Sequence, residues 1–398
     1  MPAQPTGGAY APALGSSPRA FSRNRPAGVG YNLLYSFTGY PSGGAPTGLT
    51  ALDGALYGTT TSGGTKTFGT VFVRGSAGKV RLLYSFKGGN DGAEPAGNLV
   101  VVKGVLYGTT EYGGTRGDGT VFKVSRLGHE SVIYSFKGGN DGANPMLGGL
   151  AVVAGALYGT THAGGDPSCH VDSIVGCGTA FKLSTSGKEF VLHRFKGKLD
   201  GACPAGSLAA AGGTLYGTTT FGGPGNNGTV FTLSTSGVEH VLYRFKGYPD
   251  GAQPYAGLTE RNGEFYGTTA LGGAFDYSGT VFELSTTGVE HLLHSFEGYP
   301  DGAVPYDALT AYNGELYGTT AYGGDGGQSC TGGGIVGCGS VFTVSPSGKE
   351  RVLHRFRGSP DGAHPWSSLI FADGALVGTT LSGGADAAGG IFRIAVPR

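Results

Sequence analysis

Residues 56–60 read LYGTT, and this short pattern returns along the whole chain. Its tyrosine position is filled by Tyr57, Tyr107, Tyr158, Tyr216, Tyr266 and Tyr317, and by Val377 in a seventh copy, LVGTT. These positions are 50, 51, 58, 50, 51 and 60 residues apart. Such a period is typical of repeat proteins in which each copy forms one supersecondary unit. We interpret LYGTT as a structural element, because a catalytic role would require six or seven equivalent sites.

Composition limits the classes of function. The 398 residues include 81 glycines without a collagen-like period, which favours an all-β protein with many tight turns. Lys+Arg and Asp+Glu are 27 each, so the net charge is zero, and we expect neither nucleic acid nor an anionic membrane as a partner. No apolar run approaches the roughly 20 residues that span a bilayer, so we expect no membrane insertion.

The repeat continues without a linker or a shift in composition. We therefore predict one domain over residues 31–398. Residues 1–30 are rich in Pro, Gly, Ala and Ser, and we predict a flexible N-terminal arm there. This arm lacks the uninterrupted apolar stretch of a signal peptide, so the sequence gives no evident export signal.

Each repeat divides into four strands. Residues 49–60, LTALDGALYGTT, hold two alternating segments joined by Asp53-Gly54, a dipeptide that suits a two-residue hairpin. Residues 69–86, GTVFVRGSAGKVRLLYSF, form a second hairpin that turns at Ser76–Gly78. The sequence thus predicts a four-stranded antiparallel meander for every repeat.

The two ends of the repeat array predict how the units are arranged. The array begins with a lone fourth-strand segment, YNLLYSF at residues 31–37, and stops after a third-strand segment, GGIFRIAVPR at residues 389–398. The first strand can therefore complete the last unit, which predicts a seven-bladed β-propeller closed by its own N-terminal strand. A solenoid or an open β-helix would leave this strand unexplained and would expose two sheet edges.

The recurring segments LYGTT, GG, GTVF, LYSF and DGAxP resemble the GloVer (Gloeobacter and Verrucomicrobia) tandem repeats of bacterial surface or secreted proteins. The resemblance covers the chain from about residue 31 to its C-terminus. It implies a propeller and an extracellular setting, and it supplies no catalytic residues. The spacing near 50 and the paired glycines are also kelch-like, as an analogy of architecture.

Cysteine spacing predicts two disulfides. Two pairs lie eight residues apart, each in the loop between the second and third strands of a lengthened repeat: Cys169 with Cys177, and Cys330 with Cys338. Disulfides that clamp these inserted loops indicate an oxidising compartment, and we expect an extracellular or cell-surface protein.

A zinc site is the alternative for the first cysteine pair, since His162 and His170 are near it in sequence. The second pair has no histidine in its loop, which favours disulfides for both. Cys203 has no evident partner, and we expect a buried thiol.

A second recurring feature is DGAxP in the loop between blades. Its aspartates are Asp91, Asp141, Asp200, Asp250, Asp301 and Asp361, and the first copy has Ser42 instead. Each loop offers a single carboxylate, whereas a hard cation binds several oxygen ligands. We therefore favour Asp-Gly turns in which the carboxylate caps backbone amides, and we predict no metal site and no cofactor.

The candidate binding residues follow the DGAxP proline, where the repeats differ from one another. Three consecutive blades carry aromatic residues there, Tyr255, Tyr306 and Trp366, while the other four blades carry Thr47, Ala96, Met146 and Ala205. Aromatic rings at a channel mouth can stack on sugar rings, and the nearby polar residues are Asp307, His364, Gln253 and Asn98. The alternative is that these rings only pack over the inner strands. Further tyrosines precede prolines of the same loops and either extend the surface or pack against those prolines: Tyr40, Tyr248 and Tyr299.

The sequence favours a ligand-binding protein, with carbohydrate as the ligand, over an enzyme. A glycoside hydrolase or polysaccharide lyase remains the first alternative, with acids and bases drawn from Glu94, Glu111, His162, His364 and Asp307. The second alternative is a structural or adhesive protein whose partner is another protein or a copy of itself. No nucleophile motif or phosphate loop is present in the sequence.

Overall fold

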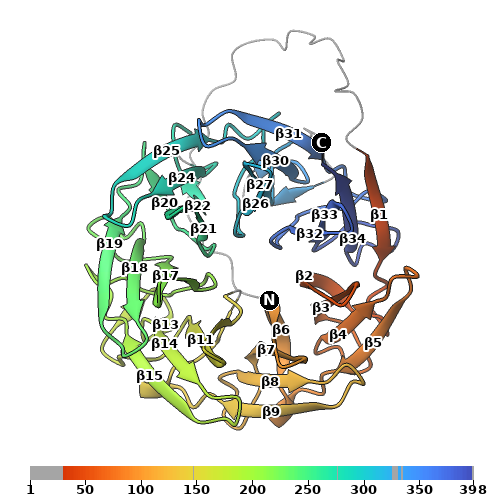
Figure 1. Cartoon of the computed structure of the whole chain (residues 1–398), viewed down its shortest axis with the longest axis horizontal. Helices are drawn as coiled ribbons and strands as arrows, with labels where there is room; N and C mark the ends of the chain where they lie inside the picture. The colour runs from red at the N-terminus through yellow and green to blue at the C-terminus, as the bar shows by residue number, and fades with distance from the viewer. Residues whose placement is uncertain (1–29, 147, 276, 325–329, 333–334, 397–398) are drawn as a thin grey trace.

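The computed structural model describes residues 30–146, 148–275, 277–324, 330–332 and 335–396. They form seven four-stranded antiparallel sheets arranged as blades around a central axis, as Figure 1 shows. The predicted seven-bladed propeller is therefore confirmed. The predicted N-terminal arm, apart from Gly30, lies outside the described residues.

The blades are numbered along the chain, and their strands are given from the axis outward. Blade 1 contains β2 (Gly44–Leu52), β3 (Ala55–Ser62), β4 (Thr70–Arg74) and β5 (Val80–Ser85). Blade 2 contains β6 (Ala93–Val102), β7 (Val105–Tyr112), β8 (Thr120–Val124) and β9 (Glu130–Ser135). Blade 3 contains β10 (Ala151–Val153), β11 (Ala156–Thr161), β14 (Thr179–Leu183) and β15 (Glu189–Arg194). Blade 4 contains β16 (Ala209–Ala211), β17 (Thr214–Thr219), β18 (Thr229–Ser234) and β19 (Glu239–Arg244).

Blade 5 contains β21 (Thr259–Arg261), β22 (Glu264–Thr269), β24 (Thr280–Leu284) and β25 (Glu290–Ser295). Blade 6 contains β26 (Thr310–Tyr312), β27 (Glu315–Thr320), β30 (Ser340–Val344) and β31 (Glu350–Arg355). Blade 7 contains β32 (Ile370–Ala372), β33 (Ala375–Thr380), β34 (Gly390–Ala395) and β1 (Tyr31–Ser36).

Short elements occupy the loops. Three two-stranded ribbons are β12 (His170–Val171) with β13 (Ile174–Val175), β20 (Gly251–Ala252) with β23 (Leu271–Gly272), and β28 (Thr331–Gly332) with β29 (Ile335–Val336). Two 3₁₀ turns are η1 (Gly89–Asp91) and η2 (Gly139–Asp141). No helix in the described ranges is both long enough and apolar enough to cross a membrane.

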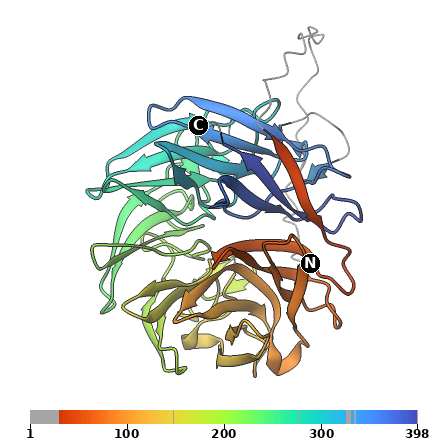
Figure 2. The same cartoon turned by 45° about the vertical axis from the view of Figure 1, so that its right-hand side comes forward.

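Blade 7 is closed by the two ends of the array, as the sequence predicts. Strand β1 pairs antiparallel with β34, from Tyr31 opposite Ile394 to Ser36 opposite Gly390. Both views of the ring show β1 running along the outer edge of blade 7 (Figures 1 and 2). The hydroxyl of Thr379 also donates to the carbonyl of Pro46 at 3.0 Å, which joins blade 7 to blade 1. The ring is thus closed at its rim and near its axis.

The inner hairpin of each blade turns at the predicted dipeptide. Asp53 and Gly54 have φ values of 50° and 72°. Two consecutive positive φ angles are the signature of a type I′ turn, whose twist matches that of the flanking strands. The corresponding pair of residues has positive φ in all seven blades. This backbone requirement explains why Gly, Asn and Asp are frequent at these turns.

The LYGTT strand is buried between neighbouring strands and blades. A Cβ atom on Gly108 would lie 2.7 Å from Cζ of Phe122, and at all seven equivalent glycines the distance to the corresponding phenylalanine is 2.5–2.7 Å. The last threonine bonds the adjacent strand of its own blade, as Thr110 bonds Thr120 at 2.8 Å. The threonine before it reaches the next blade in several repeats, as Thr218 donates to the carbonyl of Ala256 at 2.7 Å. These contacts explain why the motif is repeated.

Aromatic pairs join each blade to the next. The phenylalanine that follows each outer strand packs edge-to-face on the phenylalanine of the next GTVF segment, as Phe86 does on Phe122. The seven centroid distances, one for each junction, are 5.0–5.2 Å. Edge-to-face geometry is favourable for two rings, and the ring of pairs makes the core continuous around the propeller.

Candidate functional site

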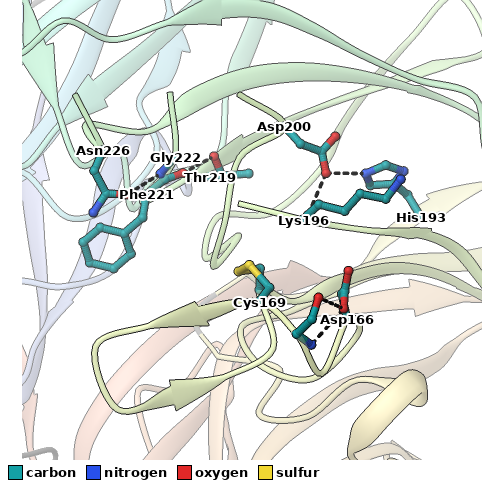
Figure 3. The surroundings of a disulfide bond; sticks show 11 residues. Asp166, Cys169, His193, Lys196, Asp200, Thr219, Phe221, Gly222 and Asn226 are labelled. Carbon is teal, nitrogen blue, oxygen red and sulfur yellow. Dashed lines mark hydrogen bonds and ion pairs between the residues drawn. A yellow bond between two sulfur atoms is a disulfide. The ribbon is translucent and has the colours of Figure 1, made fainter. Parts of the chain in front are cut away.

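Both predicted disulfides are present. Cys169 bonds Cys177, and Cys330 bonds Cys338. The first closes a loop that contains the β12–β13 ribbon, and it lies against the connection between blades 3 and 4, where a Cβ on Gly197 would be 2.8 Å from Sγ of Cys169. Figure 3 shows Cys169 beside the segment that carries Lys196 and Asp200. Because disulfides persist in oxidising compartments, this pair of bonds indicates an extracellular setting.

The remaining cysteine is a buried free thiol, as predicted. Cys203 is fully buried, and burial raises the pKa of its thiol to about 12. A thiol with this pKa stays protonated at neutral pH and is a weak nucleophile. Burial lowers the pKa of His162 to about 4, so this imidazole is neutral. Since Cys169 and Cys177 are bonded to each other, the zinc alternative for this pair gains no support.

The loops between blades and the loops after LYGTT lie on one face. Backbone bridges join them in four repeats: Ala143 with Ala163, Ala202 with Phe221, Ala303 with Tyr322, and Ala363 with Ser382. The residue before the proline of DGAxP has a φ between 52° and 58° in all seven copies. Its left-handed conformation turns the chain inward to the first strand of the next blade. This face therefore carries the seven variable positions that follow the proline.

Three of these positions form a contiguous group, which we call the aromatic cluster: Tyr255, Tyr306 and Trp366. The ring centroids of Tyr255 and Tyr306 are 5.3 Å apart, and those of Tyr306 and Trp366 are 4.7 Å apart. All three side chains are partly buried. Tyr255 and Tyr306 pack on a small core of Ala270, Ala303 and Val304. The three aromatic residues that the sequence singled out are therefore in contact with one another in the structure.

The tyrosines that precede the loop prolines are more exposed than the residues of the aromatic cluster. Tyr40, Tyr248 and Tyr299 are 68%, 65% and 67% exposed. Rings with this exposure lie on the surface, and both alternatives for them, an extension of the binding surface and packing on the adjacent prolines, stay predictions.

Two polar atoms beside the aromatic cluster are buried without a partner among the described residues. They are Nε1 of Trp366 and Nε2 of His364. The other ring nitrogen of His364, Nδ1, lies 2.9 Å from the hydroxyl of Ser382, and burial lowers the pKa of this histidine. Buried polar atoms are nearly always paired, so each of these nitrogens can bind a polar group of a ligand or of solvent.

Asp307 is held between blades 6 and 7. Its Oδ1 accepts hydrogen bonds from the hydroxyl of Ser368 at 2.6 Å and from the amide of Ala308 at 2.7 Å. Burial raises its pKa to about 6, although these hydrogen bonds act in the opposite direction. Asn98 has a similar role, since its Oδ1 accepts from the amide of Leu49 at 3.1 Å and joins blades 1 and 2. Both side chains bind neighbouring blades in this structure.

The predicted acids and bases fall into two groups. Burial, and to a smaller extent Glu94, raises the pKa of Glu111, and the side-chain Nδ2 of Asn144 donates to the backbone carbonyl of Glu111 at 3.3 Å. His162 joins this group through its backbone amide, which donates to the carbonyl of Asn144. Asp307 lies in the loop that leads into blade 6, and His364 lies in the loop that leads into blade 7. Within the described ranges no hydrogen bond, ion pair or ring contact connects the two groups.

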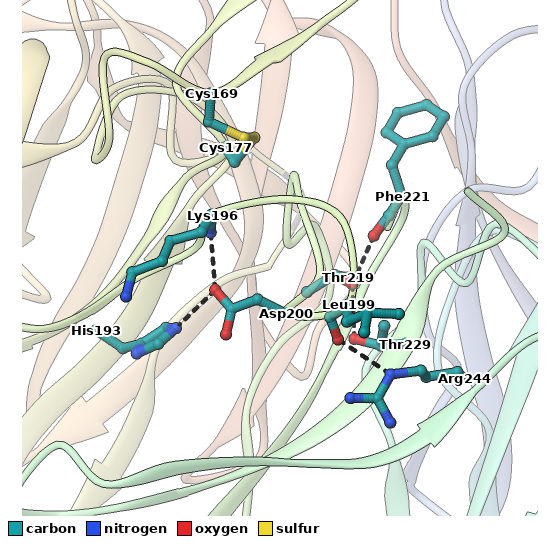
Figure 4. Close-up of polar contacts among 10 residues, drawn as sticks. All are labelled: Cys169, Cys177, His193, Lys196, Leu199, Asp200, Thr219, Phe221, Thr229 and Arg244. Carbon is teal, nitrogen blue, oxygen red and sulfur yellow. Dashed lines mark hydrogen bonds and ion pairs between the residues drawn. A yellow bond between two sulfur atoms is a disulfide. The ribbon is translucent and has the colours of Figure 1, made fainter. Parts of the chain in front are cut away.

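The DGAxP aspartates cap backbone amides, as predicted. Asp141 accepts from the amide of Lys137 at 2.8 Å, and the other five aspartates accept from the equivalent amides. Each also accepts from a tyrosine or histidine seven residues earlier in the sequence. For Asp200 this donor is Nε2 of His193 at 3.2 Å, drawn in Figure 4.

A second carboxyl group reaches five of these aspartates from the next blade. We call each such group a rim cluster; the five are Tyr84/Asp91/Glu130, Tyr134/Asp141/Glu189, His193/Asp200/Glu239, Tyr243/Asp250/Glu290 and His294/Asp301/Glu350. Burial, followed by the neighbouring aspartate, raises the pKa of each glutamate to about 7. Single loops do not predict these clusters, because the glutamate comes from the next blade, although a tyrosine or histidine stands seven residues before every DGAxP aspartate.

Comparisons with solved structures show that the fold recurs. A streptogramin B lyase structure is similar with a TM-score of 0.60 and 14% identity, and the match covers 92% of this chain and 98% of that one. A puromycin-hydrolyzing peptidase of Mycobacterium tuberculosis is similar with a TM-score of 0.53 and 10% identity over 86% of this chain and 50% of that one. At these identities the likeness concerns the fold alone.

No curated protein sequence matches the chain. The Gloeobacter/Verrucomicrobia repeat matches residues 20–171 and 131–331, which is more than half of the sequence. The strands, the turns and the junctions between blades within this range repeat as the family resemblance implies. This chain therefore belongs to the Gloeobacter/Verrucomicrobia repeat family.

Proposed function

We propose that this propeller is an extracellular binding protein whose aromatic cluster holds a carbohydrate. The observation that supports the proposal is the contact of Tyr255, Tyr306 and Trp366 on consecutive blades, at positions that are small or aliphatic in the other four blades. Aromatic faces bind the apolar faces of sugar rings, and polar groups close by bind the hydroxyls. Nε1 of Trp366 supplies a donor within the cluster, and Nε2 of His364, two residues earlier in the same loop, supplies a second unpartnered polar atom.

The two disulfides support the extracellular part of the proposal, because an oxidising compartment is where such bonds persist. The neutral net charge favours an uncharged ligand over a polyanion. The disulfide loop of blade 3 lies on the connection to blade 4, next to the blade that carries Tyr255. A clamped loop loses less conformational entropy when a ligand binds near it.

Fluorescence of the single tryptophan tests the proposal. Trp366 is excited selectively while neutral oligosaccharides and soluble polysaccharides are titrated into the full chain. We expect a saturable change for at least one sugar, weakened about tenfold or more in Tyr255→Ala and Tyr306→Ala, as expected for loss of a stacking ring. Alanine occupies the equivalent position in blades 2 and 4, so these variants should fold.

Phe190→Ala is the matched control, because this exposed ring lies on the outer strand β15 of blade 3, outside the aromatic cluster and outside the loops that carry the candidate residues. It should bind sugar as the parent chain does. If every sugar leaves the emission of Trp366 unchanged, the rings are packing residues and the proposal is wrong.

An enzyme acting on polysaccharides is the second candidate. The observation in its favour is Glu111, a carboxyl group whose pKa burial raises, close to a second carboxyl group, Glu94. A general acid needs a raised pKa of this kind. The test is release of reducing ends or of unsaturated products from a polysaccharide panel, which must disappear in Glu111→Gln. Light scattering that shows large assemblies would instead favour the structural or adhesive alternative.

A further inference from the structure

Two of the five rim clusters contain a histidine. In the first, His193 is the penultimate residue of the outer strand of blade 3, Asp200 lies in the following loop, and Glu239 begins the outer strand of blade 4. The second repeats this arrangement between blades 5 and 6 with His294, Asp301 and Glu350. In each cluster one imidazole nitrogen and two carboxylate oxygens lie within 4.8 Å of one another. Figure 4 shows His193 and Asp200 directed toward each other from separate segments.

The distances suit one small cation in each cluster. Nε2 of His193 lies 3.2 Å from Oδ2 of Asp200, and Nε2 of His294 lies 2.9 Å from Oδ2 of Asp301. Ligands placed about 2.1 Å from a tetrahedral ion are separated by about 3.4 Å, so small side-chain rotations complete the geometry. An imidazole with two carboxylates suits Zn²⁺ and similar ions, whereas Ca²⁺ and Mg²⁺ require more oxygen ligands.

Because their carboxylates are largely buried, these clusters would be stabilised by a positive charge. The side chains of Asp200 and Asp301 are only 22% and 13% exposed. Oε1 of Glu239, Oδ1 of Asp301 and Oε1 of Glu350 are buried without a hydrogen-bond partner in the described part of the chain. Two carboxylates brought together out of water repel each other, and a divalent cation between them removes that repulsion.

The other rim clusters provide an internal comparison. At Tyr134/Asp141/Glu189 the tyrosine hydroxyl donates to Asp141 at 2.6 Å and to Glu189 at 3.5 Å. A protonated phenol supplies a donor and is a poor ligand for a divalent cation. These clusters also leave a glutamate oxygen unpartnered, so the imidazole nitrogen is what distinguishes the two histidine clusters. At His354 and Asp361 the third position is held by Tyr31, which stacks on His354 with centroids 3.9 Å apart.

We propose that His193/Asp200/Glu239 and His294/Asp301/Glu350 are two divalent transition-metal sites that fasten the outer edges of blades 3 to 4 and 5 to 6. Each ion takes three protein ligands from two blades, and a water molecule completes the coordination. The sites lie on the rim and are independent of the sugar site proposed for the aromatic cluster.

Calorimetric titration of Zn²⁺ into the full chain, after dialysis against a chelator, tests the proposal. We expect two bound ions per chain, one in His193→Tyr, one in His294→Tyr, and none in the double variant. Tyrosine is the residue of the other rim clusters, so these variants should fold. Tyr134→His should add a third ion, because it completes the same ligand set with Asp141 and Glu189.

Further measurements separate these sites from accidental binding. His240→Gln and His291→Gln remove exposed histidines outside the ligand sets and should leave two ions bound. Glu239→Gln, which keeps the size of the side chain, should remove the first site even if His193→Tyr folds poorly. Excess Zn²⁺ should raise the Tm of the parent chain by several degrees and the Tm of the double variant by none. Absence of binding to the parent chain, or a stoichiometry that histidine replacement does not lower stepwise, overturns the proposal.

Discussion

At the scale of single residues, the glycine of LYGTT is required because no room exists for a side chain there, and not because its backbone conformation needs glycine. Gly108 has no positive φ, yet a Cβ on it would lie 2.7 Å from Cζ of Phe122 and 2.8 Å from Cδ2 of Leu99. Both neighbours are buried. A buried ring and a buried leucine cannot move aside without disturbing the contacts between blades.

We predict that Gly108→Ala lowers the free energy of unfolding by about 1–3 kcal/mol, because the added methyl group overpacks this strand. Urea denaturation followed by circular dichroism measures the change. The control is Gly75→Ala, since a Cβ there meets nothing within 4 Å and its φ is not positive. An equal loss in both variants would show that glycine flexibility, and not the contact with Phe122, is responsible.

At the scale of strands and loops, the rim clusters make stability depend on pH. Glu189 has a pKa of about 7 in the folded chain, raised by burial and by Asp141. A carboxyl group with a raised pKa binds its proton more tightly when folded. Its contribution to stability is therefore complete below the ordinary glutamate pKa of 4.5 and is lost as the pH rises to about 7.

We predict that the Tm falls between pH 5 and pH 8 and that Glu189→Gln makes this fall smaller. The amide keeps the size of the side chain and has no proton to lose in this range. Calorimetry in metal-free buffer at both pH values measures the effect. Glu297→Gln, at an exposed glutamate, should retain the full fall. A fall that Glu189→Gln leaves unchanged would assign the pH dependence to other groups.

The rim clusters also show what the sequence could not predict. Asp141 and Tyr134 belong to one blade and lie seven residues apart, so their contact is local. Glu189 comes from the next blade, and only the spacing of two outer strands brings it to Asp141. Asp307 is a similar case, because Ser368 of blade 7 determines what its carboxylate contacts. Turns such as Asp53-Gly54 were predictable because two neighbouring residues decide them.

At the scale of the whole molecule, closure depends on one strand and one ring. Strand β1 supplies the outer edge of blade 7, and Phe37 after it is fully buried against Phe72 of blade 1 with centroids 5.1 Å apart. The sequence predicted this closure from the order of its segments. It did not predict the distances within the aromatic cluster, which depend on how closely seven blades pack around the axis.

We predict that a chain beginning at residue 38 unfolds at a markedly lower temperature and less cooperatively. Loss of Phe37 alone removes a buried ring of the kind that contributes about 3–5 kcal/mol, and loss of β1 exposes the edge of β34. A chain beginning at Gly30 is the control, and differential scanning calorimetry compares the two. Equal transitions in both chains would contradict a closing role for β1.

The pairing of Tyr31 with Ile394 brings the two ends of the repeat array side by side at the rim. A short peptide linker between them would therefore give a circular chain without altering any blade. Opening that circle at Gly128, in the turn between β8 and β9, gives a circular permutant that starts with β9 and ends with β8. Blade 2, and no longer blade 7, would then be the blade that combines three strands from one end of the chain with one strand from the other. Which blade is built from both ends of the chain is thus set by where the chain is opened, while the closed ring of seven blades does not depend on that position.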